Sequence, residues 1–167
     1  MIHLRTAGSG DAPLLRRWDQ TPHVRAAKGD DDWAWEKELS RKESWKEPLI
    51  AELDGRPIGF VEIIDPARDE GKYWGEVDPG LRTVDIWIGE ADCLGRGHGS
   101  EMMSEALARC FASREVTAVL VDPLANNISA HRFYRRMGFR FVEESSFGDD
   151  HCHVYRLKRD DWAGPEY

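Results

Sequence analysis

The sequence predicts a single α/β domain built around one mixed β-sheet. Its 167 residues are enough for one well-buried domain and too few for two ordinary ones. Strand-like and helix-like segments follow one another in the order β, α, weak α, β, β, β, α, β, α, β, β. No repeat, linker or low-complexity segment interrupts this order in the sequence, so we expect residues 1–167 to form one domain.

The chain begins with a strand and a helix. Residues 2–7 (IHLRTA) alternate between apolar and polar side chains, as a half-buried strand does. Residues 10–20 (GDAPLLRRWDQ) offer an aspartate cap followed by apolar side chains on one helical face. Residues 22–47 carry tryptophans among dense charges with only a weak helical period, and we expect this segment to be helical and mobile.

The middle of the chain reads as a hairpin followed by a further strand. Asp54-Gly55 separates two β-rich runs within residues 48–65 and is the strongest short signal for a hairpin. A turn-rich loop then leads to residues 81–89 (LRTVDIWIG), which alternate along a strand. This alternation points Asp85 away from the aliphatic face of the strand.

The last third of the chain alternates helices and strands. An apolar stripe at three- and four-residue intervals predicts a helix after residue 99. Residues 117–122 (TAVLVD) are apolar almost throughout, as in a central strand covered on both faces. Residues 126–139 predict a second helix, whose apolar side includes Ile128 and which ends at a glycine. Two strands around Gly148 then close the chain.

The composition limits the classes of partner. Asp and Glu outnumber Lys and Arg by 31 to 23, and the formal net charge of -8 argues against nucleic acid and permits a cationic ligand. The same surplus also serves solubility. No segment is apolar enough to span a membrane or serve as a secretory signal, so we expect a cytoplasmic protein. Three cysteines without metal-ligand spacing predict reduced thiols and no metal site.

Three glycines at every second position precede the first long helix. They occur in residues 92–112 (DCLGRGHGSEMMSEALARCFA), at Gly95, Gly97 and Gly99. Glycines ahead of a helix allow a ligand, most often a phosphate, to approach the backbone amides closely. The spacing and late position do not fit a Rossmann fingerprint, and the Gly-Lys-Ser/Thr of a Walker A loop is absent from the sequence.

This stretch resembles the acetyl-CoA loop of the GCN5-related N-acetyltransferases (GNATs), which reads (Q/R)xxGx(G/A). The segment LGRGHG matches both glycine positions, while Leu94 stands where the family usually has Gln or Arg. The resemblance implies a mostly antiparallel mixed sheet with helices on both faces and acetyl-CoA as cosubstrate. It also implies a cofactor-binding set of Ile88, Gly89, Leu94, Gly95, Arg96, Gly97, His98, Gly99, Ser100 and Asn127.

A second segment carries the same resemblance. DPLANNISAHRFYRRMGF is similar to the family's closing segment, with Asn127 before a helix, an aromatic pair within it and Gly-Phe at its end. In the family, the tyrosine matched by Tyr134 lies near the sulfur of CoA. The resemblance therefore implies that Tyr134 protonates the departing thiolate. On pattern alone we place His98 and His131 on helix surfaces.

Residues 48–160 further resemble the aminoglycoside 6′-N-acetyltransferases in the order and spacing of four segments. This resemblance implies that Asp85 binds the reacting ammonium and takes its proton, while backbone amides around Ile88 and Gly89 hold the thioester oxygen. It also implies a ring of carboxylates around a polyamine. The substrate-binding set is Glu70, Trp74, Asp85, Asp122 and Asp149, with Trp33 and Trp35 as further candidates for stacking on sugar rings.

The sequence thus predicts an acetyl-CoA-dependent N-acetyltransferase of small cationic amines, aminoglycosides first, acting by direct transfer as a monomer or homodimer. Other acceptors remain open: a siderophore-type hydroxylysine, although that class usually carries His where Asp85 stands, or a protein N-terminus. A CoA-binding protein that has lost transfer is a further alternative. The acceptor's identity depends largely on residues 22–47, the least regular part of the sequence.

Overall fold

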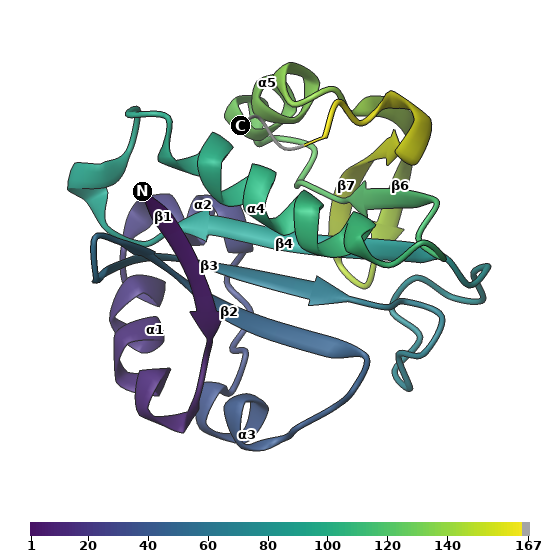
Figure 1. The fold of residues 1–167 in the computed structure, drawn as a ribbon. Helices are drawn as coiled ribbons and strands as arrows, with labels where there is room; N and C mark the ends of the chain where they lie inside the picture. The colour runs from purple at the N-terminus through teal and green to yellow at the C-terminus, as the bar shows by residue number, and fades with distance from the viewer. Residues whose placement is uncertain (165–167) are drawn as a thin grey trace.

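The computed structural model describes residues 1–164 and places one mixed β-sheet at the centre of the molecule (Figure 1). Within these residues, seven strands form the sheet in the order β1-β2-β3-β4-β5-β7-β6, and only the β4–β5 pair is parallel. The strands are β1 (Ile2–Thr6), β2 (Lys46–Leu53), β3 (Arg56–Ile64), β4 (Leu81–Ile88), β5 (Ala118–Val121), β6 (Arg140–Phe147) and β7 (Asp150–Lys158). The prediction of a mixed, mostly antiparallel sheet is confirmed.

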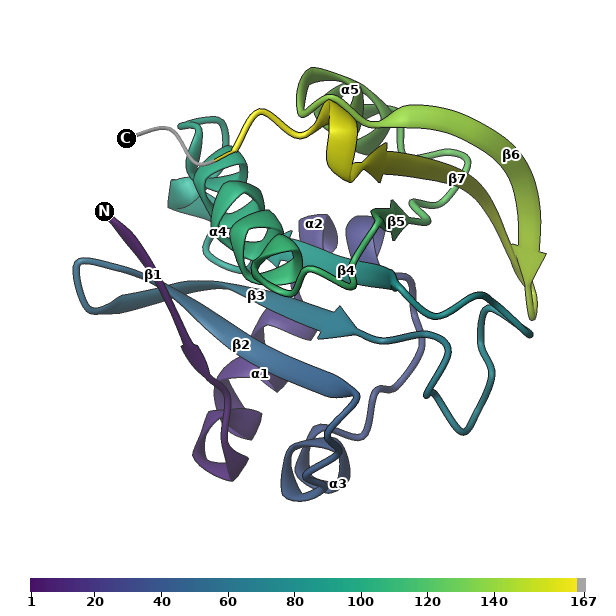
Figure 2. The same cartoon turned by 45° about the vertical axis from the view of Figure 1, so that its right-hand side comes forward.

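Helices cover both faces of the sheet, as Figures 1 and 2 show. One face carries three short helices from the first quarter of the chain, and the other carries a long helix and a short one from the second half. They are α1 (Ala12–Asp19), α2 (Pro22–Lys28), α3 (Trp35–Ser40), α4 (His98–Ala112) and α5 (Ile128–Arg136). Within residues 1–164, no helix is long and apolar enough to cross a bilayer.

The predicted hairpin forms between β2 and β3. Leu53 pairs with Arg56, so two residues make the turn, and both Asp54 (φ 50°) and Gly55 (φ 88°) adopt positive φ angles. These are the angles of a type I′ turn, which matches the twist of the strands that it connects. The hairpin sets the register of the central strands of the sheet.

Strand β4 separates two apolar cores. Val84, Ile86 and Ile88 contribute to the core beneath α4, together with side chains from β1 to β3. Trp87 projects from the opposite face into the core beneath α1 to α3, where the centre of its ring lies 4.8 Å from the centre of the Phe60 ring. The alternation therefore places Asp85 on the Trp87 face, as the sequence predicts.

Residues 22–47 fold differently from the prediction. They form α2 and α3 with a loop between them, rather than one weakly periodic helical segment. Trp35 is 2% exposed and donates a hydrogen bond to Asp19 at 2.7 Å, so it belongs to the core and is not available to stack on a sugar. Burial of aromatic side chains, rather than helical periodicity, organises this part of the chain.

Two side chains on α5 lie on the side opposite to that predicted. Ile128 is 57% exposed, whereas His131 is 6% exposed and packs on Tyr155 of β7. The ring nitrogen Nε2 of His131 lies 2.9 Å from the carbonyl oxygen of Ala125, and this bond satisfies one polar atom of the buried ring. His131 is therefore a packed residue and not a surface one.

Candidate active site

Strands β4 and β5 separate at the centre of the sheet. They pair only from Leu81 to Thr83, opposite Ala118 to Leu120, and in the described part of the chain the rest of β4 has no partner on that side. A cavity of about 920 Å³ lies at this separation. It is lined by β4, parts of β3 and of the loop that follows it, the glycine loop, α5, the start of β7, and α2 with the loop that follows it.

The separation turns backbone amides of β4 towards the gap. The N–H of Gly89 donates to the carbonyl of Ile58 on β3 at 2.7 Å. Because backbone groups alternate in direction along an antiparallel pair, the amides of Ile86 and Ile88 point the other way, into the gap. Of the two amides predicted to hold a thioester oxygen, Ile88 faces the cavity, whereas Gly89 is already bonded within the sheet.

Gly89 has a packing role instead. A Cβ atom at this position would lie 2.0 Å from the ring of Trp18, so only glycine lets the tryptophan pack against the strand end. Trp18 is 1% exposed, and its Nε1 donates to Glu90 at 3.1 Å. The contact with Trp18 therefore accounts for a glycine at position 89.

The glycine loop leads into α4 in a conformation that requires glycine. Gly95 (φ 70°) and Gly97 (φ 84°) adopt positive φ angles that other residues rarely occupy. The first bond of the helix runs from the N–H of Glu101 to the carbonyl of Gly97, so the amides of residues 98–100 have no helical partner. Together with the dipole of a 15-residue helix, these amides form an anion-binding end.

The loop residues differ in how they meet the cavity. Leu94, Gly95, Gly97, Gly99 and Ser100 line it. Arg96 is exposed outside that lining, and His98 is half-buried in the first turn of α4. The geometry thus favours backbone contacts along residues 94–100, with Arg96 as a charged side chain at the rim.

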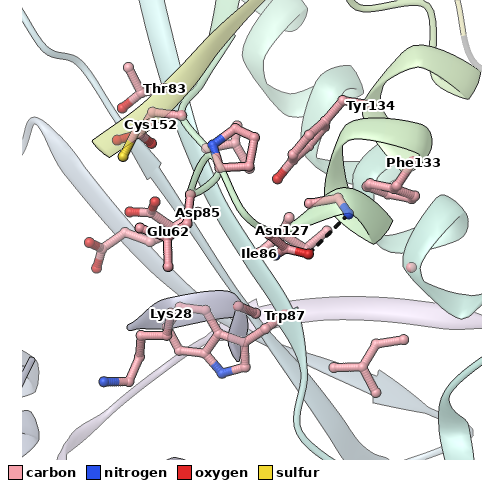
Figure 3. A pocket seen from close by; sticks show the side chains of 18 of the residues that line it. Lys28, Glu62, Thr83, Asp85, Ile86, Trp87, Asn127, Phe133, Tyr134 and Cys152 are labelled. Carbon is pink, nitrogen blue, oxygen red and sulfur yellow. Dashed lines mark hydrogen bonds between the residues drawn. The ribbon is translucent and has the colours of Figure 1, made fainter. Parts of the chain in front are cut away.

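Helix α5 contributes a cap and a buried hydroxyl. The side chain of Asn127 accepts a hydrogen bond from the backbone N–H of Ala130 at 3.2 Å, which caps the helix at the wall of the cavity (Figure 3). The ring of Tyr134 packs against Phe139 and Tyr155, and its hydroxyl points into the cavity. Burial, followed by the nearby Asp85 and Asp122 carboxylates, raises the pKa of Tyr134, so its hydroxyl keeps its proton.

Two of the predicted acids meet in the cavity. Asp85 and Asp122 both line it, and the hydroxyl of Tyr73 donates to Asp122 at 2.7 Å. Burial, with smaller effects of Asp122 and Glu62, raises the pKa of Asp85 well above its usual range. Burial also raises the pKa of Asp122 to about 6, although the hydrogen bond from Tyr73 opposes this. Trp74 also lines the cavity and packs against Tyr73.

The other two predicted acids lie outside the cavity lining. Glu70 and Asp149 are exposed, and their neighbours Asp69 and Asp150 line the cavity instead. Asp69 accepts hydrogen bonds from amides two and four residues later, which fixes the direction of the loop. Asp149 is in the two-residue turn between β6 and β7, whereas Asp150 begins β7. In both places, the acid that lines the cavity is next in the sequence to the one that the family resemblance put forward.

The sequence reasoning also missed Glu62. This residue is on β3 directly opposite Asp85, lines the cavity and is 8% exposed. Burial is the main reason that the pKa of Glu62 rises to about 7. A single carboxylate inside the apolar run FVEII was a signal in the sequence. Its position opposite Asp85 depends on strand register, which the sequence does not reveal.

A profile described as the acetyltransferase (GNAT) domain matches residues 8–147. The chain belongs to this GNAT family. Among curated relatives, aminoglycoside N(6′)-acetyltransferase type 1 of Klebsiella pneumoniae is 34% identical over 93 residues, 55% of this chain and 46% of that protein. The lysine N-acyltransferase MbtK of Mycolicibacterium paratuberculosis is 27% identical over 160 residues, 92% of this chain and 72% of that protein.

Solved structures give the same family relationship over the whole GNAT domain. Aminoglycoside acetyltransferase AAC(6′)-Ib in complex with coenzyme A is 26% identical, with a TM-score of 0.84 and 96% of each chain covered. The same enzyme with coenzyme A and kanamycin is 25% identical, with the same TM-score and coverage. The sequence match spans about half the length of the curated Klebsiella relative, whereas these structural matches extend over nearly all of both chains.

The cavity of this GNAT domain has two chemically different ends. Unpaired amides at the start of α4 favour an anion, and carboxylates from β3, β4, β5 and β7 favour a cation at the other end. The two lysines in the lining already have acidic partners: Lys28 lies 3.6 Å from Asp19, and Lys46 is paired with Glu38. These lysines therefore do not neutralise the carboxylates at that end of the cavity, which remain able to bind a cationic ligand.

Proposed function

We propose that this GNAT domain transfers an acetyl group from acetyl-CoA to a primary amine of a small cationic molecule by direct transfer. The observation that carries the proposal is the single cavity that joins the amides at the start of α4 to the carboxylates of β3 and β4. A phosphate-bearing donor and an amine acceptor would meet beside the free amide of Ile88. This arrangement brings the two reactants together without a covalent enzyme intermediate.

The donor end would use the backbone rather than side chains. Acetyl-CoA supplies a thioester, whose carbonyl carbon is attacked by the amine nitrogen as the bond to sulfur breaks. The amides of residues 98–100 hold the pyrophosphate, and the amide of Ile88 donates to the carbonyl oxygen as negative charge develops there. The exposed Leu94 provides no such polar contact.

Asp85 would prepare the acceptor. It holds the ammonium through a charge-assisted hydrogen bond and accepts a proton from the amine, which must be neutral to attack. A carboxylate with a raised pKa is a better base than an ordinary one, because its proton affinity lies closer to that of the amine. Tyr134 donates its proton to the departing thiolate from the opposite wall of the cavity.

For the acceptor we put the 6′-amino group of an aminoglycoside first. The relatives named for this activity resemble the chain in sequence and in structure. The cavity adds Asp69, Asp122 and Asp150 to the acids around Asp85, which suits an acceptor with several ammonium groups. Trp33 and Trp74 in the lining offer aromatic surfaces for sugar rings.

A lysine-type amine is the second candidate. The alignment with MbtK covers more of the chain than the aminoglycoside relative does, although at lower identity. A lysine-type acceptor carries a single reacting amine on a flexible chain and so uses fewer of the acids that line the cavity.

Isolation of the product distinguishes the two acceptors. The full chain is incubated with acetyl-CoA and an equimolar mixture of kanamycin and N6-hydroxylysine, and the products are separated and located by two-dimensional NMR. We expect kanamycin acetylated at the 6′ nitrogen. Acetylation of hydroxylysine alone would replace the aminoglycoside proposal, and acetylation at another amine would contradict the 6′ assignment.

A further inference from the structure

Glu62 is a buried carboxylate with no function in the scheme above. It pairs with Asp85 across β3 and β4, and opposite residues of an antiparallel pair project from the same face of the sheet. Figure 3 shows the two side chains next to each other at the cavity. Within residues 1–164, neither carboxylate accepts a hydrogen bond from a protein donor. Their oxygens are therefore directed to whatever enters the cavity.

The surroundings of Glu62 do not neutralise it. Lys46 on β2 is the cation that acts on it, but Lys46 is itself paired with Glu38 of α3. The charged groups that face Glu62 from each neighbouring element are Lys46 on β2, Glu38 on α3, Asp69 in the loop after β3 and Asp85 on β4. Three of these four are acids, and Asp85 also faces the carboxylate of Asp122. Charged carboxylates at Glu62 and Asp85 would therefore repel each other and their acidic neighbours.

We propose that Glu62 and Asp85 jointly bind the cationic amine of the acceptor, and that in the free protein the pair holds one proton, which the amine displaces. Like charges on opposite strands are destabilising, so one shared proton removes the repulsion until a cation arrives. The ammonium then provides the compensating charge and the proton leaves to solvent. This inference rests on the proposed function, because it needs a cationic acceptor at Asp85.

Proton release measures this exchange directly. Kanamycin is titrated into the full chain with CoA at pH 7 by calorimetry, in phosphate and in Tris, and the difference in enthalpy gives the protons released. We expect release of up to one proton in the wild type and less in Glu62→Gln, where only Asp85 can hold a proton, with affinity about tenfold or more weaker because one charge-assisted bond is lost. Glu105→Gln, at an exposed position on α4, is the matched control and should behave as wild type.

A second measurement tests the pair without an acceptor. The carboxyl carbon of Glu62 is followed by NMR as the pH changes, in the wild type and in Asp85→Asn. We expect Glu62 to titrate well above 4.5 in both proteins, chiefly because it is buried, and at a lower pH in the variant, where the neighbouring carboxylate is gone. If kanamycin fails to bind, the proposal of an aminoglycoside acceptor is contradicted. The titration still shows whether Glu62 and Asp85 share a proton. Ordinary titration of Glu62, or tight kanamycin binding without proton release, would overturn the inference.

A second cluster lies on the opposite face of the last hairpin. Asp150 and Cys152 line the cavity, so the alternate residues His151 and His153 of β7 project from the other side. Glu144 on β6 pairs with His153. Its two oxygens lie 3.4 Å from Nε2 of His151 and 3.3 Å from Nε2 of His153, and ligand atoms of all three residues lie within 4.8 Å of one another.

The two Glu144–histidine distances, one from each oxygen of the carboxylate, suit ligands of a transition-metal ion. Two ligands each about 2.0–2.1 Å from a tetrahedral ion are about 3.3–3.4 Å apart. We infer that Glu144, His151 and His153 bind a Zn²⁺ ion, with water in the fourth position. Two imidazoles from β7 and one carboxylate from β6 are donors that Zn²⁺ prefers, and the pairing of the two strands holds them at fixed spacing.

Calorimetry with Zn²⁺ alone tests this site in the full chain. We expect binding of one ion, weakened about tenfold or more in His151→Ala and in Glu144→Gln because each removes a ligand. His3→Ala, which removes an exposed histidine on β1, is the control. Co²⁺ in place of Zn²⁺ should give the absorption spectrum of a tetrahedral ion. Equal affinity in wild type and His151→Ala, or no stoichiometric binding, would show that the cluster is only a set of surface ion pairs.

Discussion

Among single residues, Asp85 is the proposed base on which our account of amine acetylation depends. Its carboxyl must lose its proton before it can take one from the acceptor, and burial raises its pKa well above the ordinary range. We therefore expect kcat/KM to rise with pH over a range above that of an exposed carboxyl. Asp85→Asn should lower kcat/KM by about 10²–10⁴-fold and abolish this rise. An unchanged pH profile in the variant would exclude Asp85 as the base.

Tyr134 is the proposed acid on the leaving-group side. Tyr134→Phe keeps the ring that packs against Phe139 and Tyr155 and removes only the hydroxyl. We expect kcat to fall by about 10²-fold with little change in KM, because proton donation to sulfur matters only during transfer. Steady-state kinetics with acetyl-CoA and the amine acceptor measure both constants. Wild-type turnover in this variant would contradict the role of Tyr134 and would indicate that solvent protonates the thiolate.

The buried carboxyl of Glu62 also links stability to pH. Its pKa rises from 4.5 to about 7 on folding, so its contribution to stability is complete below 4.5 and is lost as pH rises through about 7. Glu62→Gln stays neutral and lacks this dependence. From pH 5 to pH 8, the stability of the wild type should fall relative to the variant, by at most about 3 kcal/mol. Urea unfolding at both pH values measures it, and a constant difference would contradict the raised pKa.

The sequence was informative about residues that act through local motifs. Asp85 and Tyr134, which the family resemblance put forward, both line the cavity, and strand alternation alone placed Asp85 away from the aliphatic face of β4. Glu62 was not found, because its pairing with Asp85 requires the register of β3 against β4 across a 16-residue loop. Glu70 was predicted to bind the substrate, but Asp69 lines the cavity in its place. The turn that Asp69 stabilises there sets which of the two neighbouring acids faces inward.

At the scale of the element, the glycine loop and α4 form the anion-binding end. Gly97 has a φ angle of 84° with open space around its Cβ position, and Gly55 in the β2–β3 turn has a φ angle of 88° with equally open space. Alanine at either site should therefore cost a similar strain of about 1 kcal/mol. Only Gly97→Ala should weaken CoA binding, by about tenfold if one amide contact is lost. Equal CoA affinity in the two variants would place the anion elsewhere.

Other elements differ in how far local signals decide them. The β2–β3 hairpin follows from two turn residues alone. The short helices within residues 22–47 depend instead on long-range aromatic contacts, such as Trp33 and Trp35 with Phe60 and Trp87. No local pattern encodes those contacts, so the periodicity there was too weak to predict the breaks between α2 and α3.

In the whole molecule, the cavity depends on a sheet whose two faces each pack against an apolar core. Apolar side chains of β4 alternate between the core beneath α4 and the core beneath α1 to α3. These contacts and the pairing with β3 hold the strand in place where, among residues 1–164, it has no partner on the β5 side beyond Thr83. The separation of β4 from β5 thus exposes amides and carboxylates without unfolding the sheet. The family resemblance predicted this arrangement, but strand patterns alone did not.

The most direct measurement compares two aminoglycosides that differ only at the 6′ position. Neomycin carries an amine there and paromomycin a hydroxyl, so the pair isolates the group proposed to accept the acetyl. CoA release from acetyl-CoA is followed with a thiol reagent for the full chain and for Asp85→Asn. We predict rapid release with neomycin, little with paromomycin and little in the variant. Equal release with both sugars, or none with neomycin while acetyl-CoA still binds, would contradict acetylation of a 6′-amine.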